Sequence, residues 1–157
     1  MVSLIVNGAR REIDAPTDEP LAYVLRNRLG LPGTKVACGL EQCGACLVTV
    51  DGECRYACTL PVGECADRSV TTVEGLGGDG LHPVQRALLD FNAAQCGYCL
   101  SGILVRAAAL FDADPAPSPA QIREALAPQL CRCGAQPRVL RALETLARDA
   151  ASQEGRP

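Results

Sequence analysis

Two different patterns of apolar residues divide the chain into halves. Up to about residue 73 the apolar residues form short runs of strand length, whereas from His82 onward they recur at helical spacing. Between the halves, residues 75–80 include four glycines in six positions, a composition typical of a linker. The pattern therefore predicts two units, residues 1–76 and residues 81–151.

The first half predicts a small mixed sheet with one helix. Its strand-like segments are residues 3–6, 10–15, 46–50, 53–58 and 69–73. The Asn-Gly and Asp-Gly pairs at 7–8 and 51–52 are the residues that two-residue hairpin turns require. Between the hairpins, a helix is expected after Asp18, which can cap it, and before Gly30, which can end it. One face of this helix carries Leu21, Val24, Leu25 and Leu29.

The second half predicts four helices. They cover residues 84–91, 100–111 and 119–126 and a last segment that begins at Pro137. Ser118 and Gln121 form a capping box around a proline at the first helical position. His82, the only histidine, stands before Pro83 as a helix-entry residue. The fold class is therefore α+β, with the sheet first and the helices second.

Composition excludes several classes of protein. The 157 residues carry a net charge of −3 without a basic block, which argues against nucleic acid as a partner. No segment approaches the ~20 apolar residues that cross a bilayer, so no membrane insertion is expected. The N-terminal residues enter a strand pattern without a signal sequence, which indicates the cytoplasm, with membrane association or export only through a partner subunit.

The cysteines carry the chemistry. Eight of the ten fall into two sets of four, Cys38, Cys43, Cys46 and Cys58, and Cys96, Cys99, Cys131 and Cys133. Four thiolates are the ligand count of a [2Fe–2S] cluster, and C-x4-C-x2-C with a distant fourth cysteine is the plant-type ferredoxin spacing. Glycines between the thiols, at 39, 44 and 97, let a loop turn tightly and direct N–H groups at an anion. The chain is therefore expected to bind two [2Fe–2S] clusters and to transfer electrons.

Four other interpretations of the cysteines are weaker. A secreted disulfide scaffold conflicts with the absence of a signal sequence, and isolated buried thiols do not explain the glycine-rich spacing. Zinc also takes four cysteines, but Cys131 and Cys133 lie closer together in sequence than in the usual zinc knuckle. A Rieske centre needs two histidines, and this chain has one. The chain has no catalytic triad or phosphate-binding loop, so no catalytic residue of its own is expected.

With both sets in view, the sequence resembles the small iron–sulfur subunits of the molybdenum hydroxylases, the xanthine dehydrogenase family. The resemblance covers roughly residues 2–148 and depends on a linked series of motifs. They are Gly33-Thr-Lys35, Cys38-Gly-Leu-Glu-Gln-Cys-Gly-Ala-Cys46, Val50-Asp-Gly52, Val73-Glu-Gly-Leu76, His82-Pro-Val-Gln85, Gln95-Cys-Gly-Tyr-Cys99 and Leu130-Cys-Arg-Cys133. The resemblance implies an N-terminal β-grasp ferredoxin-like domain followed by a C-terminal four-helix bundle.

The resemblance also implies roles for particular residues. It favours Cys58 over Cys54 as the fourth ligand of the first set, and leaves Cys54 and Cys65 as structural or free thiols. A separate large subunit would hold molybdopterin dinucleotide and carry out the oxidation. The second cluster would lie next to the pterin, with Gln95 and Cys133 at positions that contact it.

The last motif indicates the substrate class. Many relatives continue it with Thr-Gly-Tyr, whereas this chain has Cys133-Gly-Ala-Gln-Pro-Arg138, which is similar to the small subunits of nicotinate dehydrogenase and isoquinoline oxidoreductase. Such enzymes hydroxylate N-heteroaromatic compounds and deliver electrons to a cytochrome c or an FAD subunit. Aldehyde-oxidising relatives share much of the pattern, and a free-standing electron carrier is the other alternative.

Overall fold

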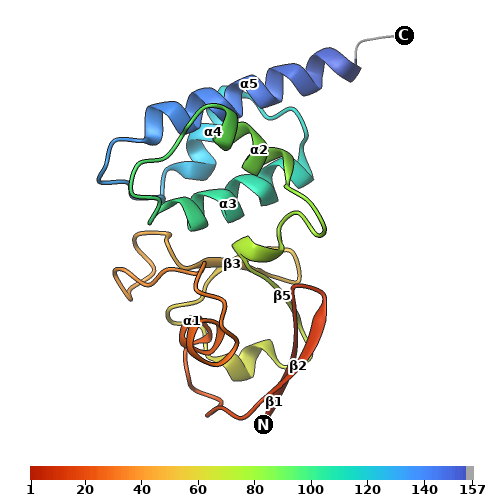
Figure 1. Cartoon of the computed structure of the whole chain (residues 1–157), viewed down its shortest axis with the longest axis vertical. Helices are drawn as coiled ribbons and strands as arrows, with labels where there is room; N and C mark the ends of the chain where they lie inside the picture. Colours follow the sequence, from red (N-terminus) through yellow and green to blue (C-terminus); the bar gives the residue numbers. More distant parts are fainter. Residues whose placement is uncertain (155–157) are drawn as a thin grey trace.

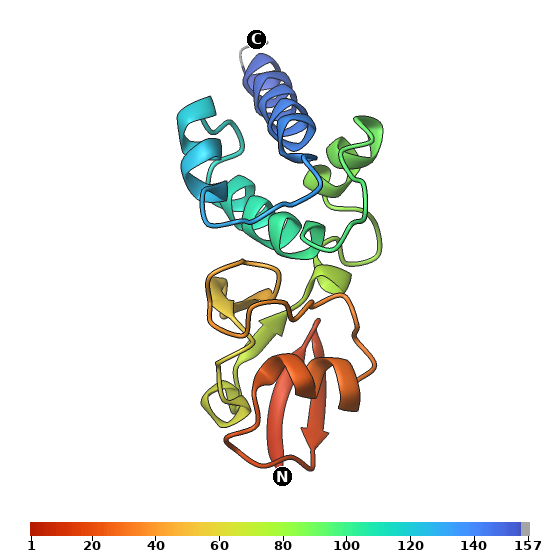
Figure 2. The ribbon, with the colours of Figure 1, turned by 90° about the vertical axis from the view of Figure 1, so that its left-hand side faces the viewer.

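The computed structural model describes residues 1–154 and consists of two halves stacked along the long axis of the molecule (Figure 1). The N-terminal half contains a five-stranded sheet, and the C-terminal half contains four helices. Figure 2 shows that helix α3 lies between the sheet and the other three helices. This arrangement confirms the α+β fold class, with a β-grasp half followed by a four-helix bundle.

The sheet has the strand order β2-β1-β5-β3-β4. The first strand and the last strand, β1 and β5, pair in parallel at its centre, and the other neighbours are antiparallel. The strands are β1 (Val2–Val6), β2 (Ala9–Ile13), β3 (Leu47–Val50), β4 (Glu53–Tyr56) and β5 (Ser69–Thr71). Two short 3-10 helices, η2 (Val62–Cys65) and η3 (Val73–Gly75), flank β5.

Both predicted hairpin turns are present. Asn7 and Gly8 have φ values of 50° and 80°, and Asp51 and Gly52 have values of 50° and 85°. Two successive residues with positive φ match the twist of the flanking strands, which is why Asn-Gly and Asp-Gly occur here.

The helix of the first half differs in detail from the prediction. It begins as α1 (Leu21–Tyr23) and continues as the π-helical segment η1 (Val24–Arg28), in which the Leu29 N–H donates to the Val24 carbonyl at 3.1 Å. Asp18 does not cap it, because the helix starts at Leu21 after an extended Pro20 that makes no side-chain cap. The apolar face is as predicted, since Leu21, Val24 and Leu25 are fully buried.

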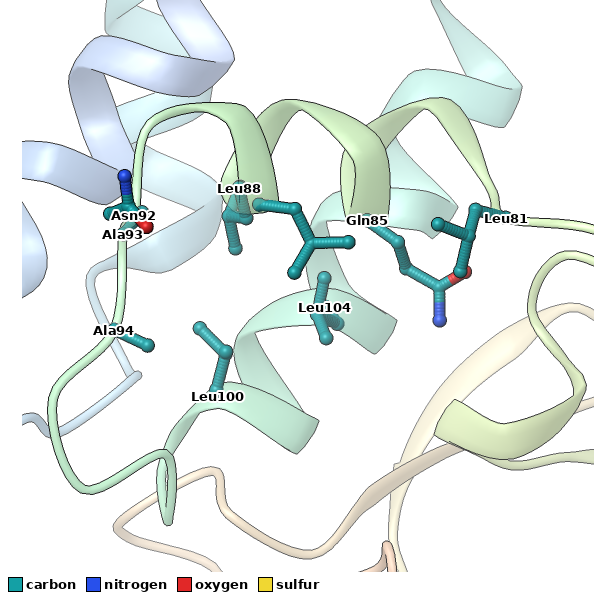
Figure 3. A pocket seen from close by; sticks show the side chains of 9 residues that line it. Leu81, Gln85, Leu88, Asn92, Ala93, Ala94, Leu100 and Leu104 are labelled. Atoms are coloured by element: carbon teal, nitrogen blue, oxygen red, sulfur yellow. The ribbon is translucent and has the colours of Figure 1, made fainter.

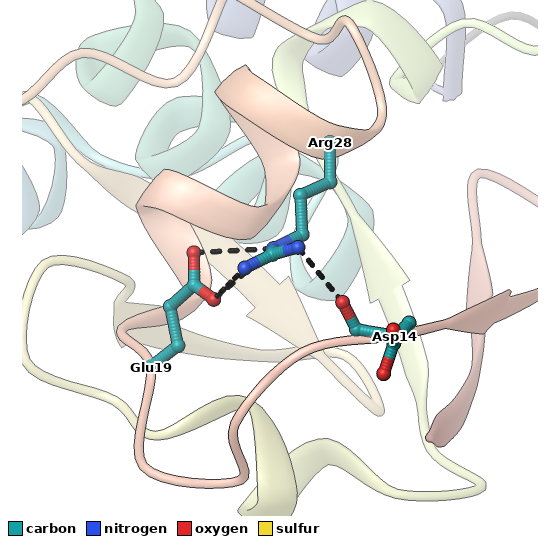
Figure 4. Close-up of polar contacts among 3 residues, drawn as sticks. All are labelled: Asp14, Glu19 and Arg28. Carbon is teal, nitrogen blue, oxygen red and sulfur yellow. Dashed lines mark hydrogen bonds and ion pairs between the residues drawn. The ribbon is translucent and has the colours of Figure 1, made fainter.

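The helix has no side-chain cap at its start, but an arginine at its end holds it in place. The Arg28 Nε and Nη2 atoms donate to Glu19 Oε2 at 3.0 and 2.7 Å, and Nη1 donates to the Asp14 carbonyl at 2.8 Å (Figure 4). The planar guanidinium can hold both partners at once. It therefore ties the helix to the segment that enters it from β2.

The helices of the second half lie where the pattern predicted them. They are α2 (Pro83–Asp90), α3 (Leu100–Ala113), α4 (Pro119–Leu126) and α5 (Gln136–Glu154). Ser118 and Gln121 form the expected capping box at α4. His82 is the N-cap of α2, where its Nδ1 accepts the Val84 N–H at 3.2 Å and its own N–H donates to Gln85 Oε1 at 2.9 Å.

Each half has its own apolar core. The first includes Leu4, Leu21, Leu25, Val48 and Val70, and the second includes Val84, Ile103, Ile122, Val139 and Leu143. The exact limits of the two units, at residues 76 and 81, stay a prediction of the sequence. Among the described residues, no helix combines the length and the apolar character needed to cross a membrane.

The halves meet where α3 passes over the loop that precedes β3. A Cβ added to Gly102 of α3 would lie 1.9 Å from the carbonyl oxygen of Gly44 in that loop. Beside this contact, Ser101 Oγ donates to the Ala45 carbonyl at 3.1 Å and the Tyr98 hydroxyl donates to the Val36 carbonyl at 2.6 Å. The absence of a side chain at Gly102 lets the two main chains approach.

We therefore predict that Gly102→Ala destabilises the protein although alanine is the better helix former. The methyl group overlaps a main-chain carbonyl, and overpacking of this kind costs about 1–3 kcal/mol. For a chain of this size the melting temperature falls by ~2–4 °C per kcal/mol. Thermal unfolding followed by circular dichroism measures the change.

Gly80→Ala is the matched control, because a Cβ added at Gly80 meets nothing within 4 Å. Its melting temperature should stay close to that of the unaltered protein. Equal melting temperatures for the two variants would show that the Gly102 contact is not tight.

Candidate metal centres

Three cysteines of the first set lie on the loop between η1 and β3, and the fourth follows β4. Cys38 and Cys43 are partly exposed on this loop, whereas Cys46 at its end and Cys58 after β4 are buried. Gly39 and Gly44 have φ values of 66° and 77°, so their glycine identity allows the tight turns of the loop. The structure thus brings together four residues that the sequence separates by up to 20 positions.

Within this set the thiols form two pairs. Cys38 contacts Cys43, and Cys46 contacts Cys58. Cys65 is fully buried in the apolar core of the first half. Cys54 is on β4, where burial raises its pKa and the positive charge of Arg106 of α3 partly offsets that rise. Neither Cys54 nor Cys65 belongs to the two pairs.

The second set has the same paired arrangement. Cys96 and Cys99 lie just before α3, and Cys131 and Cys133 lie in the connection from α4 to α5. The Sγ atoms of Cys133 and Cys96 are 3.2 Å apart, and Cys99 contacts Cys131. Each pair therefore joins one thiol from before α3 with one from before α5.

In each set, hydrogen bonds stabilise the ionised form of one thiol, whereas burial favours the neutral form of another. The N–H groups of Leu40 and Gln42 donate to Cys38 Sγ, both at 3.4 Å, and lower the pKa of Cys38 to about 7. Burial raises the pKa of Cys46 to about 12.

The second set repeats this contrast. The Tyr98 N–H, followed by the Cys133 thiol, lowers the pKa of Cys96, while burial raises the pKa of Cys99 to about 11. A buried thiolate needs a compensating positive charge, which a metal supplies.

This donor set fits a binuclear centre. In a [2Fe–2S] cluster with four cysteine ligands each iron takes two of them, and the structure presents two pairs in each set. Among the described residues, no three Cys, His, Asp or Glu side chains are grouped closely enough for a single ion. The residues present therefore fit one [2Fe–2S] cluster per set.

The outer surface of the second set is open. Gln95 is exposed beside Cys96, which is also exposed, and Cys133 is partly exposed. An apolar pocket of about 340 Å³ begins next to Gln95 and runs between α2 and α3 (Figure 3). Its lining is Leu81, Gln85, Leu88, Leu89, Asn92, Ala93, Ala94, Leu100 and Leu104. Sequence reasoning missed this pocket because two helices contribute to it.

A hydrogen bond between the two cysteine-bearing loops was also missed. The Leu130 N–H donates to the Cys43 carbonyl at 3.0 Å. Leu130 precedes Cys131, so the bond connects the neighbourhood of one set directly with a cysteine of the other. It joins main-chain atoms, which leave no signature in residue type.

Comparison with known proteins agrees with these centres. Residues 4–75 match the family model described as a 2Fe-2S iron-sulfur cluster binding domain, and residues 72–144 match the model described as a [2Fe-2S] binding domain. The chain therefore belongs to the proteins that bind two [2Fe–2S] clusters in consecutive domains.

Relatives that match this chain over almost their whole length show to which family of iron–sulfur proteins it belongs. One subunit of the nicotinate dehydrogenase of Pseudomonas putida is 48% identical over 93% of this chain and 94% of its own length. The alpha subunit of isoquinoline 1-oxidoreductase from Brevundimonas diminuta is 46% identical over 96% of this chain and 100% of its own. The chain is an iron–sulfur small subunit of the molybdenum hydroxylases, the xanthine dehydrogenase family, and thus part of a molybdenum-dependent oxidoreductase.

Solved structures show the same fold. Quinoline 2-oxidoreductase from Pseudomonas putida matches with a TM-score of 0.89 and 33% identity over 98% of this chain and 96% of the matched one. The aldehyde oxidoreductase from Desulfovibrio desulfuricans matches with a TM-score of 0.88 and 40% identity, but this chain spans only 17% of that longer one. The same module thus occurs both as a separate polypeptide and as part of a larger chain.

We predict that Cys58→Ser removes one cluster and leaves the other. Reduced protein should show two distinguishable spin signals by electron paramagnetic resonance, and this variant should lose one of them, with about half the iron. Cys54→Ser is the matched control and should keep both signals, because Cys54 lies outside the thiol pairs. The opposite result would transfer the ligand role from Cys58 to Cys54.

We also predict that removal of the clusters destabilises both halves, because the ligand-bearing loops fold together with the metal. A ligand at about 1,000 times its Kd stabilises the folded state by about 4.1 kcal/mol. For this chain length that corresponds to a fall in melting temperature of at least about 8 °C. An unchanged melting temperature in protein free of iron and sulfide would contradict the coupling.

Proposed function

We propose that this chain is the electron-transfer subunit of a molybdenum hydroxylase. It takes electrons from a molybdopterin dinucleotide centre in a large subunit, then passes them through two [2Fe–2S] clusters to a cytochrome c or FAD acceptor. Cys38, Cys43, Cys46 and Cys58 bind the first cluster, and Cys96, Cys99, Cys131 and Cys133 bind the second. When bound, each cluster accepts and releases one electron at a time.

One observation carries the proposal more than any other, the hydrogen bond from Leu130 to Cys43. Leu130 directly precedes Cys131 in the chain, and its N–H donates to the carbonyl of Cys43. The ligands of the two clusters are therefore connected by a few covalent bonds and one hydrogen bond of 3.0 Å. A short bonded route supports electron passage between the clusters. A soluble carrier would need only the first half of this chain.

The second cluster is the one that faces the large subunit in this proposal. Gln95 and Cys133 lie on the open side of the second set, where they can contact a pterin. The apolar pocket begins beside them, and the nearby side chains of Leu89 and Leu130 are each 61% exposed. Exposed apolar surface of this kind supports a protein partner at this face.

The substrate class in this proposal is an N-heteroaromatic compound similar to nicotinate. It is supported by relatives named for nicotinate, isoquinoline and nicotine, and by the structural match to quinoline 2-oxidoreductase. The alternative is aldehyde oxidation, because the aldehyde oxidoreductase of Megalodesulfovibrio gigas is 39% identical over 83% of this chain. The proposed compartment is the cytoplasm, where cysteines stay reduced and can bind metal, and none of the ten cysteines forms a disulfide in the described structure.

Purification of the native complex tests this function. We expect a brown complex with a molybdopterin-containing large subunit in fixed stoichiometry. Nicotinate or isoquinoline should reduce both clusters under anaerobic conditions, and an aromatic aldehyde should not. A brown monomer would instead support a free carrier, and a colourless zinc protein would refute the proposal.

We predict that Gln95→Ala slows the reduction of the clusters by substrate while dithionite still reduces them fully. A lost hydrogen bond to a cofactor costs about 1 kcal/mol, which corresponds to a roughly fivefold lower rate. Stopped-flow absorbance of the complex measures both reactions.

Gln42→Ala is the matched control, because Gln42 is exposed and directly precedes a cysteine of the first set, as Gln95 does in the second. This variant should be reduced by substrate at the unaltered rate. If Gln42→Ala is slow and Gln95→Ala is not, the order of the clusters is the reverse of the proposed one.

A further inference from the structure

Gln129 is a buried polar residue without a partner for its side chain. It lies in the connection between α4 and α5 and is 2% exposed. Its main-chain groups are satisfied, since its N–H donates to the Leu126 carbonyl at 2.9 Å and its carbonyl accepts Gln136 Nε2 at 3.1 Å. By contrast, both Oε1 and Nε2 of its amide are buried and make no hydrogen bond in the described part of the chain.

The amide lies against the loop of the first cysteine set, although Gln129 belongs to the second half. A Cβ added to Gly44 would lie 2.1 Å from Gln129 Oε1 and 2.6 Å from Nε2. Gly44 separates Cys43 from Cys46, which belong to the two different thiol pairs of the set. The missing side chain at Gly44 therefore makes room for the amide beside the loop segment that joins the two pairs.

Neighbouring main-chain acceptors in this loop already have donors. The Cys43 carbonyl accepts the Leu130 N–H at 3.0 Å, and the Gly44 carbonyl accepts the Leu47 N–H at 3.2 Å. The Ala45 carbonyl accepts Ser101 Oγ at 3.1 Å and the Lys35 N–H at 3.2 Å. Each of these carbonyls thus already accepts at least one hydrogen bond. The sulfur atoms beside the amide, the thiolates of the set and the sulfides of the cluster that it holds, are the further acceptors available to its N–H groups.

We propose that the Gln129 side-chain amide donates a hydrogen bond to a sulfur of the first [2Fe–2S] cluster and raises its reduction potential. The inference rests on the proposed binding of that cluster by Cys38, Cys43, Cys46 and Cys58. Reduction adds negative charge to the sulfurs, so an N–H donor stabilises the reduced cluster more than the oxidised one. The helical half thereby makes the cluster of the other half a better acceptor for electrons from its own cluster.

Gln129→Met in the intact complex tests the proposal, because methionine keeps the length and lacks the amide. A redox titration followed by electron paramagnetic resonance should show the equilibrium constant for reduction of the first cluster falling about tenfold. For one electron this is a potential lower by about 59 mV. The second cluster should keep its potential, and both spin signals should keep their intensity.

Gln136→Met is the matched control, since it removes the hydrogen bond to the Gln129 carbonyl but leaves the Gln129 amide in place. Both of its potentials should equal those of the unaltered complex. An equal shift in this control would show that loosening of the segment, and not the amide, changes the potential, and would overturn the proposal. A shift confined to the second cluster in Gln129→Met would overturn it as well.

A second measurement needs no substitution at Gln129. Protein labelled with ¹⁵N in the glutamine side-chain amides should show a ¹⁵N coupling to the reduced first cluster by pulsed electron paramagnetic resonance. The coupling should persist in Gln42→Leu, which removes the label next to Cys43. Absence of the coupling would overturn the proposal and leave a buried water as the partner of the amide. If the unaltered complex shows only one spin signal, by contrast, the cysteine ligand assignment is wrong and the role of Gln129 is not the cause.

Discussion

The architecture depends on a contact between two main chains that have no side chain between them. At Gly102 the helix α3 lies directly on the carbonyl of Gly44, in the loop of the first cysteine set. Because α3 also begins immediately after Cys99, this contact fixes the second set relative to the first. Hydrogen bonds from Ser101, Tyr98 and Leu130 to carbonyls of the first half hold the same approach. The two halves have separate cores, yet their metal-binding loops behave as one structural element.

The two cysteine sets share one electrostatic pattern, in which one thiol has a lowered pKa and another has a raised pKa. In each, one thiol at the loop tip receives main-chain N–H groups and its pKa is lowered, while another at the start of a buried element has a raised pKa. Without a metal, burial opposes ionisation of the second thiol. The iron centre therefore stabilises a charge distribution that the protein alone disfavours, which couples cluster binding to folding.

Local signals in the sequence predicted most of the architecture. The Asn7-Gly8 turn, the Ser118 capping box and the cysteine spacing each depend on residue types that have few alternative uses, and the structure confirms the turn and the box. The Asp18 cap was wrong because the chain stays extended through Pro20, and a carboxylate one residue later binds Arg28 instead. The roles of Gln129 and of the Leu130 N–H could not be predicted, because both depend on contacts between loops more than 80 residues apart in sequence.

The parallel pairing of β1 with β5 has a consequence for how the protein is made. These central strands are the first and the last of the sheet, and all four cysteines of the first set lie between them in sequence. During synthesis the sheet can close only after every one of these cysteines has left the ribosome. Closure of the sheet then places Cys46 and Cys58 in the interior while Cys38 and Cys43 still face solvent. In the closed sheet the site therefore keeps one side open to solvent, at Cys38 and Cys43, through which iron and sulfide can reach the buried pair.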